Sequence, residues 1–424
     1  MIVRRHRTRW LRWPVLMGTL TAAAGCAARA PGQSTSQPLT QVEGVRVLRL
    51  AGTPRLRGVA QGYHLADDIV TLLSEFISGG GVPGGSAVYE AALIPFSRRM
   101  HVSDRYKQEL EGIMEGIGKR CGGPAPVTAL GRPITYDDLL AMNCMADALS
   151  LACSSFAVWG ALTSDGDTLA GRNLDWRFSE ALFDRQLVVV RAPDPARSAL
   201  GWVSIGWPGL IGCYTGMNSE GVTLSIHDAP AGRGSGGTGP VPRTFAMRDA
   251  LEAARAASAV DDVTRILRAG SVFVGNNVMV TRPFVAGSVP SVVFEYDGNV
   301  THSGGVTVRM PKPPNYQICT NHFRERAQPV PCARYDALKR VLASASAGRS
   351  PVTLPDAWEM LDTVAFTGKA FPAKITFTSV VFEPNKRRMH VAFASPGRSA
   401  PSGAHVTLDV ARLLQEASLV DARE

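Results

Sequence analysis

The sequence predicts an α+β fold in which strand-forming segments build a layered sandwich behind a mainly helical N-terminal part. The 424 residues are 45% hydrophobic and include 42 glycines and 28 prolines, a composition typical of a globular chain with many turns. Apolar residues recur at helical spacing before residue 152, whereas β-branched and aromatic runs bounded by turn residues dominate from residue 153 onward.

Residues 1–25 have the features of an export signal. Five arginines precede a short apolar stretch at residues 15–25, which is too short to span a bilayer as a stop-transfer helix. Residues 23–26, Ala-Ala-Gly-Cys, resemble a bacterial lipobox, so Cys26 is a candidate for lipid attachment; an ordinary cleaved signal is the alternative. The Ala-, Pro-, Gln- and Ser-rich residues 26–41 are typical of a flexible tether. We therefore expect a lipid-anchored protein on the periplasmic side of a bacterial membrane.

The net charge of +9 is little evidence for an acidic partner, because much of it belongs to the leader. Five of these charges are leader arginines with no balancing acid, so the remaining chain carries +9 − 5 = +4. No later segment is a dense Lys/Arg run interleaved with aromatic residues, as a nucleic-acid groove requires. Nucleic acid is therefore not an expected partner.

Residues 42–152 are expected to form a helical pre-segment after a first strand at residues 42–50. Residues 106–118 carry an apolar stripe at helical spacing. Thr135 is a helix N-cap with Asp137 and Asp138 in the first turn, where negative charge suits the helix dipole.

From Cys153 the pattern changes to strands, interrupted by two helices expected at residues 244–257 and 261–269. The predicted strands cover residues 156–162, 168–173, 186–191, 221–227, 272–280, 291–296 and 316–320. A late hairpin is predicted from residues 375–382 and 389–394, joined by Glu-Pro-Asn-Lys.

The first of these strand pairs carries the most informative chemistry. A strand beginning at Ala152 and Cys153 turns at residues 164–167 and returns to Arg172 and Asp175. A guanidinium beside a thiol favours the nucleophilic thiolate, and a nearby carboxylate could hold an amine or orient the arginine. For a lone cysteine, however, a buried structural Cys153 with a local Arg172–Asp175 ion pair is the commoner situation.

The surrounding motifs resemble those of N-terminal-nucleophile (Ntn) hydrolases that cleave linear amides. The likeness is greatest to the penicillin acyltransferase-like (isopenicillin-N acyltransferase) Cys peptidase group, related to acid ceramidase and bile salt hydrolase. There a Cys opens a strand and a Gly-Arg-Asn-x-Asp segment, here residues 171–175, lies on the paired strand. Residues 216–221 resemble the family's Asn-x-x-Gly turn, and residues 319–323 its Thr-Asn-His segment. The resemblance extends over residues 42–395, although the hairpin from Cys153 is longer than in some relatives.

The resemblance implies an αββα sandwich that cleaves its own Ala152–Cys153 bond. Residues 153–424 would then be the catalytic piece, and the pre-segment a subunit or propeptide. The freed α-amine, whose reference pKa is about 7.7–8, would act as the base for the thiol of Cys153, which forms a thioester with the substrate acyl group.

The resemblance also implies roles for the other site residues. Asp175 would hold the amine and Arg172 would stabilise the thiolate. The Asn321 side chain and the backbone N–H of Asn218 would form the oxyanion hole; a turn asparagine at Asn218 and a loop cap at Asn321 are the structural alternatives. Arg334 corresponds to a later family arginine, with a surface arginine as its alternative.

The expected substrate is a small-molecule N-acyl amide, and hydrolysis and acyl transfer both stay open. Tryptophans 159, 176, 202 and 207 are candidates for an apolar pocket wall, although a tryptophan in a sheet more often belongs to the core. A non-catalytic ligand-binding lipoprotein on the same scaffold is a second hypothesis. A papain-like protease, with His322 or His227 paired to Cys153, is a third, although a papain-type Cys-Trp context is missing.

Neither a metal nor a nucleotide cofactor is expected. The sequence contains no C-x-x-C or H-E-x-x-H spacing. Residues 232–237 fit G-x-G-x-x-G, but Pro240 and Pro242 intervene before the next helix, so no helix N-terminus follows directly. An exported chain can form disulfides, and Cys319–Cys332 or Cys121–Cys144 are the pairings considered.

Overall fold

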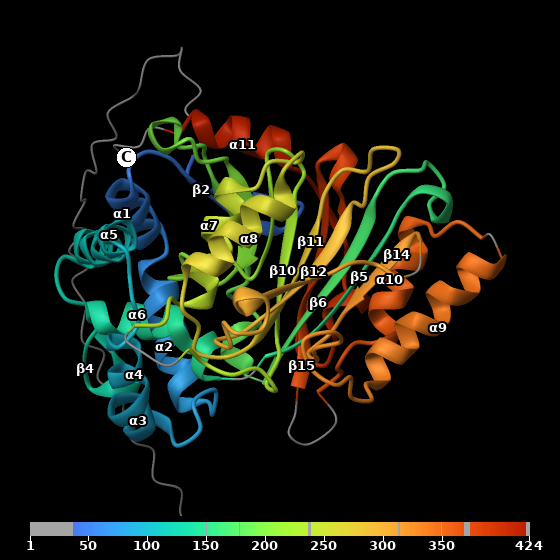
Figure 1. Ribbon diagram of the computed structural model, residues 1–424. Helices are drawn as coiled ribbons and strands as arrows, with labels where there is room; N and C mark the ends of the chain where they lie inside the picture. Colours follow the sequence, from blue (N-terminus) through green and yellow to red (C-terminus); the bar gives the residue numbers. More distant parts are fainter. Residues whose placement is uncertain are drawn as a thin grey trace, which may run out of the picture. The chain divides into compact units, whose positions relative to one another are not determined.

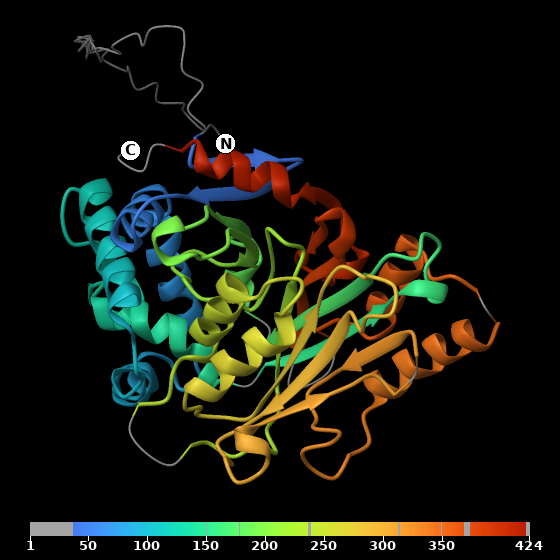
Figure 2. The same cartoon turned by 45° about the horizontal axis from the view of Figure 1, so that its top comes forward.

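The computed structural model describes residues 37–420, with gaps at 150, 178, 236–238, 313, 349 and 369–373. The export signal, Cys26 and most of the expected tether lie outside the described residues. Two β-sheets lie face to face, with helices over their outer faces (Figures 1 and 2). The predicted α+β sandwich is confirmed. No helix in the described ranges is long and apolar enough to cross a membrane.

One sheet has six strands, all antiparallel, and contains the predicted Cys153 hairpin. Its order is β14 (Tyr316–Cys319), β5 (Ala152–Val158), β6 (Leu169–Arg177), β15 (Lys374–Glu383), β16 (Arg388–Phe393) and β17 (Val406–Asp409). Strand β5 begins at Ala152, as the hairpin prediction expects and four residues before the β-branched and aromatic run at residue 156, because Ala152 and Cys153 already pair with Asp175 and Leu174 of β6. Helices α9 (Ala333–Gly348) and α10 (Leu354–Thr363) cover its outer face.

Besides a two-stranded sheet of β3 (Pro126–Val127) and β4 (Arg132–Pro133), the other large sheet has nine strands, antiparallel except for the β2–β7 pair. Its order is β1 (Leu39–Val42), β2 (Val45–Leu50), β7 (Leu187–Arg191), β8 (Trp202–Gly206), β9 (Thr215–Asn218), β10 (Thr223–Asp228), β11 (Asn276–Thr281), β12 (Ser291–Tyr296) and β13 (Val306–Arg309). The tether expected up to residue 41 therefore ends earlier, because Leu39 and Val42 pair with Leu48 and Val45. Helices α7 (Arg243–Ala253) and α8 (Ala259–Ala269) cover its outer face, and α11 (Val410–Ser418) lies along β2, β7 and β8.

The pre-segment is mainly helical. It contains α1 (Pro54–His64), α2 (Ala66–Ser78), α3 (Gly85–Val88), α4 (Ile94–Arg98), α5 (Asp104–Cys121) and α6 (Tyr136–Ala148). The Thr135 cap is confirmed: its side chain accepts the N–H of Asp138, whose carboxylate accepts the N–H of Thr135.

Helices α1 and α5 lie in unusually close contact (Figure 1). Glycines make this approach possible: a Cβ atom added at Gly58 would lie 2.0 Å from the carbonyl oxygen of Glu109, and one at Gly112 would lie 2.2 Å from that of Arg55. The helix that carries Glu109 is thereby held directly against α1.

Neither disulfide considered from the sequence is formed. The six cysteines of the described residues are all free. The thiols of Cys319 and Cys332 instead approach Thr320, at 3.8 Å from its carbonyl oxygen and 3.7 Å from its hydroxyl oxygen, respectively.

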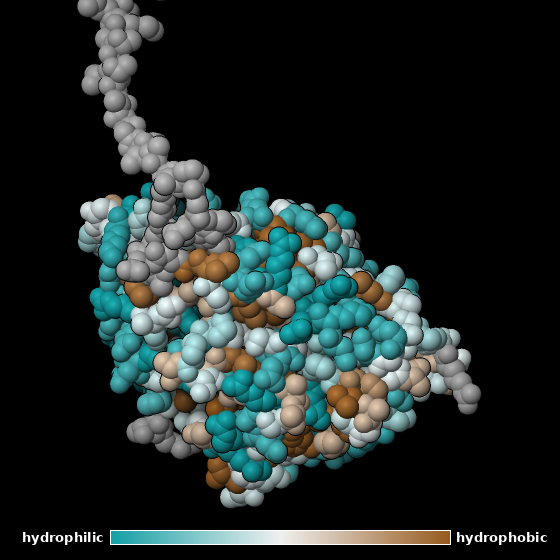
Figure 3. All heavy atoms as spheres, turned by 90° about the horizontal axis from the view of Figure 1, so that it is seen from above, coloured by the Kyte–Doolittle hydropathy of each residue, from teal (hydrophilic) through white to brown (hydrophobic). Residues whose placement is uncertain are grey.

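The surface seen from above is mainly hydrophilic (Figure 3). Apolar residues on that face are scattered rather than joined in one large patch, which is usual for a protein surface.

Candidate active site

Cys153 lies inside the sandwich, between the two sheets. It is fully buried near the start of β5, and Ser155, two residues on, pairs with Arg172 of β6. Directly opposed residues of an antiparallel pair share a face, so Cys153 and Arg172 point the same way. That face meets the other sheet, because Arg172 donates from Nε to Thr215 Oγ1 (3.2 Å) and from Nη2 to the Ile226 carbonyl (2.8 Å).

A second group of polar side chains holds the backbone of Cys153. The N–H of Cys153 donates to Asn321 Oδ1 (2.7 Å), which also accepts from Arg334 Nη2 (2.8 Å). Arg334 Nη1 donates to Asp175 Oδ2 (2.8 Å), and Thr376 Oγ1 donates to Asp175 Oδ1 (2.5 Å). Asp175, Arg334 and Asn321 therefore form one connected network that ends at the amide nitrogen of Cys153.

The electrostatics of the uncut chain keep Cys153 protonated. Burial raises the pKa of its thiol; Arg172 opposes this shift, and Asp175 and Asp228 add to it. The net direction is upward, so Arg172 does not make the thiolate prevail here, contrary to the sequence-based expectation. Burial likewise raises the pKa of the Asp175 carboxyl, against the opposing influence of Arg334.

Asp228, at the end of β10, belongs to the site and was missed in the sequence. Its Oδ2 accepts the N–H of Leu151 (2.5 Å), two residues before Cys153, and its backbone carbonyl accepts from Asn321 Nδ2 (3.0 Å). Arg243 forms an ion pair with its carboxylate. The predicted strand at residues 221–227 stopped one residue short; following it to its end would have placed an acid opposite the cysteine.

The backbone and side chain of Asn218 form hydrogen bonds within a turn and with the end of α7. Its backbone N–H donates to the Val222 carbonyl (3.0 Å), and its Oδ1 accepts the N–H groups of Glu220 and Val222. Its Nδ2 donates to the carbonyls of Leu251 and Ala254. In the uncut chain Asn218 thus fixes a turn and the end of α7, and its oxyanion role stays a prediction.

Both histidines of the papain-like hypothesis have imidazole pKa values shifted downward, and one of them has a side-chain partner other than Cys153. His227 Nε2 lies 2.8 Å from Ser155 Oγ, and burial holds the pKa of this imidazole well below its usual range. The backbone carbonyl of His322 accepts from Asn277 Nδ2 (3.0 Å), and burial also lowers the pKa of its side chain. Within the described ranges, no group of three His, Cys, Asp or Glu side chains is placed to hold a metal ion.

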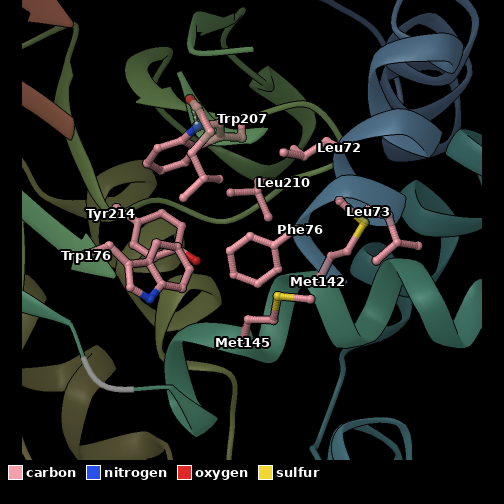
Figure 4. Close-up of a pocket in the computed structure, with 10 residues that line it drawn as sticks. Leu72, Leu73, Phe76, Met142, Met145, Trp176, Trp207, Leu210 and Tyr214 are labelled. Atoms are coloured by element: carbon pink, nitrogen blue, oxygen red, sulfur yellow. Dashed lines mark hydrogen bonds between the residues drawn. The ribbon is translucent and has the colours of Figure 1, made fainter. Parts of the chain in front are cut away.

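An apolar pocket lies where the pre-segment meets the sandwich (Figure 4). Its walls are Leu72, Leu73 and Phe76 of α2, Met142 and Met145 of α6, Trp176 of β6, and Leu182, Trp207, Leu210 and Tyr214. Only about 30 Å³ is open, so flexible side chains nearly fill it. Leu174 of β6 lies directly opposite Cys153, and Trp176 lies two residues after Leu174 on the same strand. Trp176 therefore points to the same face of the sheet as Cys153.

Two of the four candidate tryptophans, Trp176 and Trp207, therefore line this pocket. Trp159 belongs to the apolar core instead, and Trp202 packs beside the guanidinium of Arg191.

The family model described as acyl-coenzyme A:6-aminopenicillanic acid acyl-transferase matches residues 162–398. This range begins after Cys153 and includes Arg172, Asp175, Asn321 and Arg334. A curated uncharacterized protein of Archaeoglobus fulgidus is 23% identical over 216 residues, which are 44% of this chain and 33% of that protein. The chain thus spans about a third of the length of this relative.

The chain is also similar to several solved structures, at low sequence identity. The Caenorhabditis elegans ortholog of N-acylethanolamine-hydrolyzing acid amidase is 20% identical, with a TM-score of 0.41 over 55% of this chain and 93% of that one. A conjugated bile acid hydrolase mutant of Clostridium perfringens is 12% identical, with a TM-score of 0.44 over 62% and 94%. Penicillin V acylase of Agrobacterium tumefaciens is 14% identical, with a TM-score of 0.36 over 61% and 91%.

Proposed function

This chain belongs to the acyl-coenzyme A:6-aminopenicillanic acid acyl-transferase family, and from that premise we propose that Cys153 is its nucleophile and becomes N-terminal by self-cleavage. Membership makes the chain an acyltransferase or amidohydrolase of the Ntn type. One observation carries the assignment of the nucleophile: the amide nitrogen of Cys153, the atom that cleavage would free, ends the network of Asn321, Arg334 and Asp175.

Self-cleavage begins with attack of Cys153 Sγ on the carbonyl carbon of Ala152. A C–S bond forms, the thiol proton passes to the departing nitrogen, and the C–N bond breaks, which leaves a thioester and a free α-amine. Water then hydrolyses the thioester to the carboxylate of Ala152 and regenerates the thiol. The new amine lies beside Asn321 Oδ1, within the network that includes Asp175.

The same groups account for turnover. The α-amine, with a reference pKa of about 7.7–8, takes the thiol proton as the thiol attacks a substrate amide. Asp175 retains the amine through the network, and Arg172 stabilises the charge that develops on sulfur. Asn321 Nδ2, which now donates towards the carbonyls of Asp228 and Leu151, is the proposed oxyanion donor. Loss of one such donor typically costs about 3–4 kcal/mol of barrier.

The substrate is proposed to be a linear N-acyl amide whose acyl group reaches the apolar pocket. The pocket is on the Cys153 face of β6, and its methionines can move to admit an acyl group. The acceptor of the acyl group is water or a second amine.

The pre-segment is proposed to remain bound after cleavage as a subunit. Glu109 of α5 is fully buried and accepts from Arg248 Nη1 (2.7 Å), and it forms a second ion pair with Arg191. Both arginines belong to the piece that begins at Cys153. Separation would break both buried ion pairs and expose to water the apolar core that the two pieces share, which is unfavourable.

Export and lipid attachment at Cys26 are proposed from the basic, apolar and lipobox-like leader alone. Radiolabelled fatty acid should be incorporated into the expressed full chain and not into its Cys26→Ser variant. Soluble, unlabelled wild-type protein would refute the anchor.

The enzymatic proposal is tested by intact mass and denaturing gels of purified protein, followed by a screen of N-acyl amides with product mass analysis. Wild type should show two pieces that split before Cys153, and acyl transfer to water or to an added amine. A wild-type chain that stays whole yet is fully active would refute the N-terminal nucleophile.

A further inference from the structure

Self-cleavage and turnover would pass through the same kind of intermediate. In both, an acyl group is attached to Cys153 Sγ as a thioester, and in the first event the acyl group is the pre-segment itself, ending in Leu151-Ala152. The uncut chain therefore displays a bound acyl group before any substrate arrives. This inference rests on the proposed function.

The displayed acyl group has a polar contact in addition to its apolar surroundings. Counted from the Ala152 carbonyl carbon, the chain runs through Ala152 Cα, Ala152 N, Leu151 C and Leu151 Cα to Leu151 N, which is five bonds away. That nitrogen donates to Asp228 Oδ2 at 2.5 Å. A charged carboxylate thus receives the N–H at a fixed separation from the reacting carbonyl.

Asp228 is held in position by contacts of both its carboxylate and its backbone carbonyl. Arg243, itself buried, forms an ion pair with Oδ1 of Asp228 and also donates from Nη1 to Asn276 Oδ1 (2.9 Å). The backbone carbonyl of Asp228 accepts from Asn321, the proposed oxyanion donor (3.0 Å). The residue that carries the recognising carboxylate is therefore directly hydrogen-bonded to Asn321, whose side chain is proposed to stabilise the reacting carbonyl.

We propose that Asp228 is a specificity-determining residue that selects acyl groups with an N–H donor five bonds from the scissile carbonyl carbon, as a dipeptidyl group has. Cleavage of the pre-segment releases Leu151 from Asp228, and the N–H of the substrate's acyl group takes its place. The acyl class is then peptide-like rather than a plain hydrocarbon chain, and the residue that carries the donor is apolar, because Leu151 is buried among apolar residues.

A matched pair of substrates tests this on the wild-type, self-cleaved enzyme. One is the anilide of N-acetyl-leucyl-alanine, whose leucine amide N–H stands where the N–H of Leu151 stands. The other is the anilide of 2-acetoxy-4-methylpentanoyl-alanine, in which an ester oxygen replaces that N–H and both substrates stay uncharged. We expect kcat/KM to be about ten- to a hundredfold higher for the first, because a hydrogen bond to a charged group contributes on this scale.

The Asp228→Asn variant tests whether the charge of the carboxylate is needed, because asparagine has the same shape as aspartate and no charge. The ratio of the two kcat/KM values should fall towards one, and self-cleavage of the variant should slow, because a neutral amide oxygen replaces the charged oxygen that accepts these N–H groups. Less than about a twofold preference in wild type, or cleavage at Cys153 without turnover of either anilide, would overturn the assignment of Asp228. A wild-type chain that neither splits nor turns over any amide overturns the proposed function itself, so the two failures are distinguishable.

Discussion

Replacing Glu109 with glutamine should destabilise the protein more than any other single change of charge in the pre-segment. The carboxylate is fully buried and is shared by Arg191 and Arg248. Glutamine keeps the shape but leaves both guanidinium groups buried without their common counter-ion. Removing one partner of a buried ion pair costs about 3–5 kcal/mol. At roughly 2 °C per kcal/mol for a large domain, Tm should fall by about 6–10 °C.

The measurement is thermal and urea unfolding of Glu109→Gln in a Cys153→Ala background, so that uncut chains are compared. Glu111→Gln is the matched control: its half-exposed carboxylate lies 3.8 Å from Arg55, and such pairs contribute at most about 1 kcal/mol. Equal stability of the two variants would refute the claim that the buried ion pairs join the pre-segment to the sandwich.

The stability difference between the wild-type chain and Glu109→Gln should depend on pH, and its direction follows from the pKa of Glu109. Burial would raise the pKa of Glu109, but Arg191, Arg248 and Arg57 outweigh it and hold the pKa below its usual range. A lowered folded-state pKa contributes stability that is present above the unfolded value, about 4.3, and is lost as pH falls through the folded value. The stability difference between Glu109 and its glutamine variant should therefore be complete at pH 7 and should shrink in acid.

Three further outcomes are expected. Cys153→Ala should give a single uncut chain without activity, whereas Cys121→Ala, which removes an exposed thiol, should split and react normally on gels and in amide assays. Arg172→Gln should raise the pKa of the Cys153 thiol further, since Arg172 is the group that lowers it, and alkylation by iodoacetamide should need a higher pH; Arg172→Lys should restore part of the shift. Met145→Phe should fill the apolar pocket and lower kcat/KM for long acyl groups relative to acetyl, and an unchanged ratio would exclude the pocket as the acyl site.

Much of the site could be predicted because the relevant residues are close in sequence. A single hairpin brings Cys153, Arg172 and Asp175 together, and the period-two alternation of its strands fixes which side chains share a face. Long-range pairing is harder to foresee. Thr376 reaches Asp175 from β15, 201 positions away, and no local pattern announces that contact.

The differences from the sequence-based expectations have identifiable causes. Asn218 was interpreted from a motif at a turn; in the uncut chain its side chain satisfies backbone groups of that turn, and its oxyanion role stays a prediction. Arg172 was expected to dominate the thiol, but burial, which a sequence does not display, has the larger effect. The strands β8 and β9 were not predicted at all; β9, with Thr-Gly-Met-Asn, has little of the β-branched character on which the prediction relied.

The glycine contact between α1 and α5 limits how this protein can diverge. Since a methyl group at Gly58 would clash with the carbonyl oxygen of Glu109 itself, any side chain there must push α5 outward together with the carboxylate it carries. A small steric change on α1 would thus move Glu109 away from Arg191 and Arg248, and these two buried arginines would lose an ion-pair partner. Positions that never touch the reaction should therefore tolerate substitution as poorly as the nucleophile does, and a survey of variant viability would find them beside one another on that helix pair.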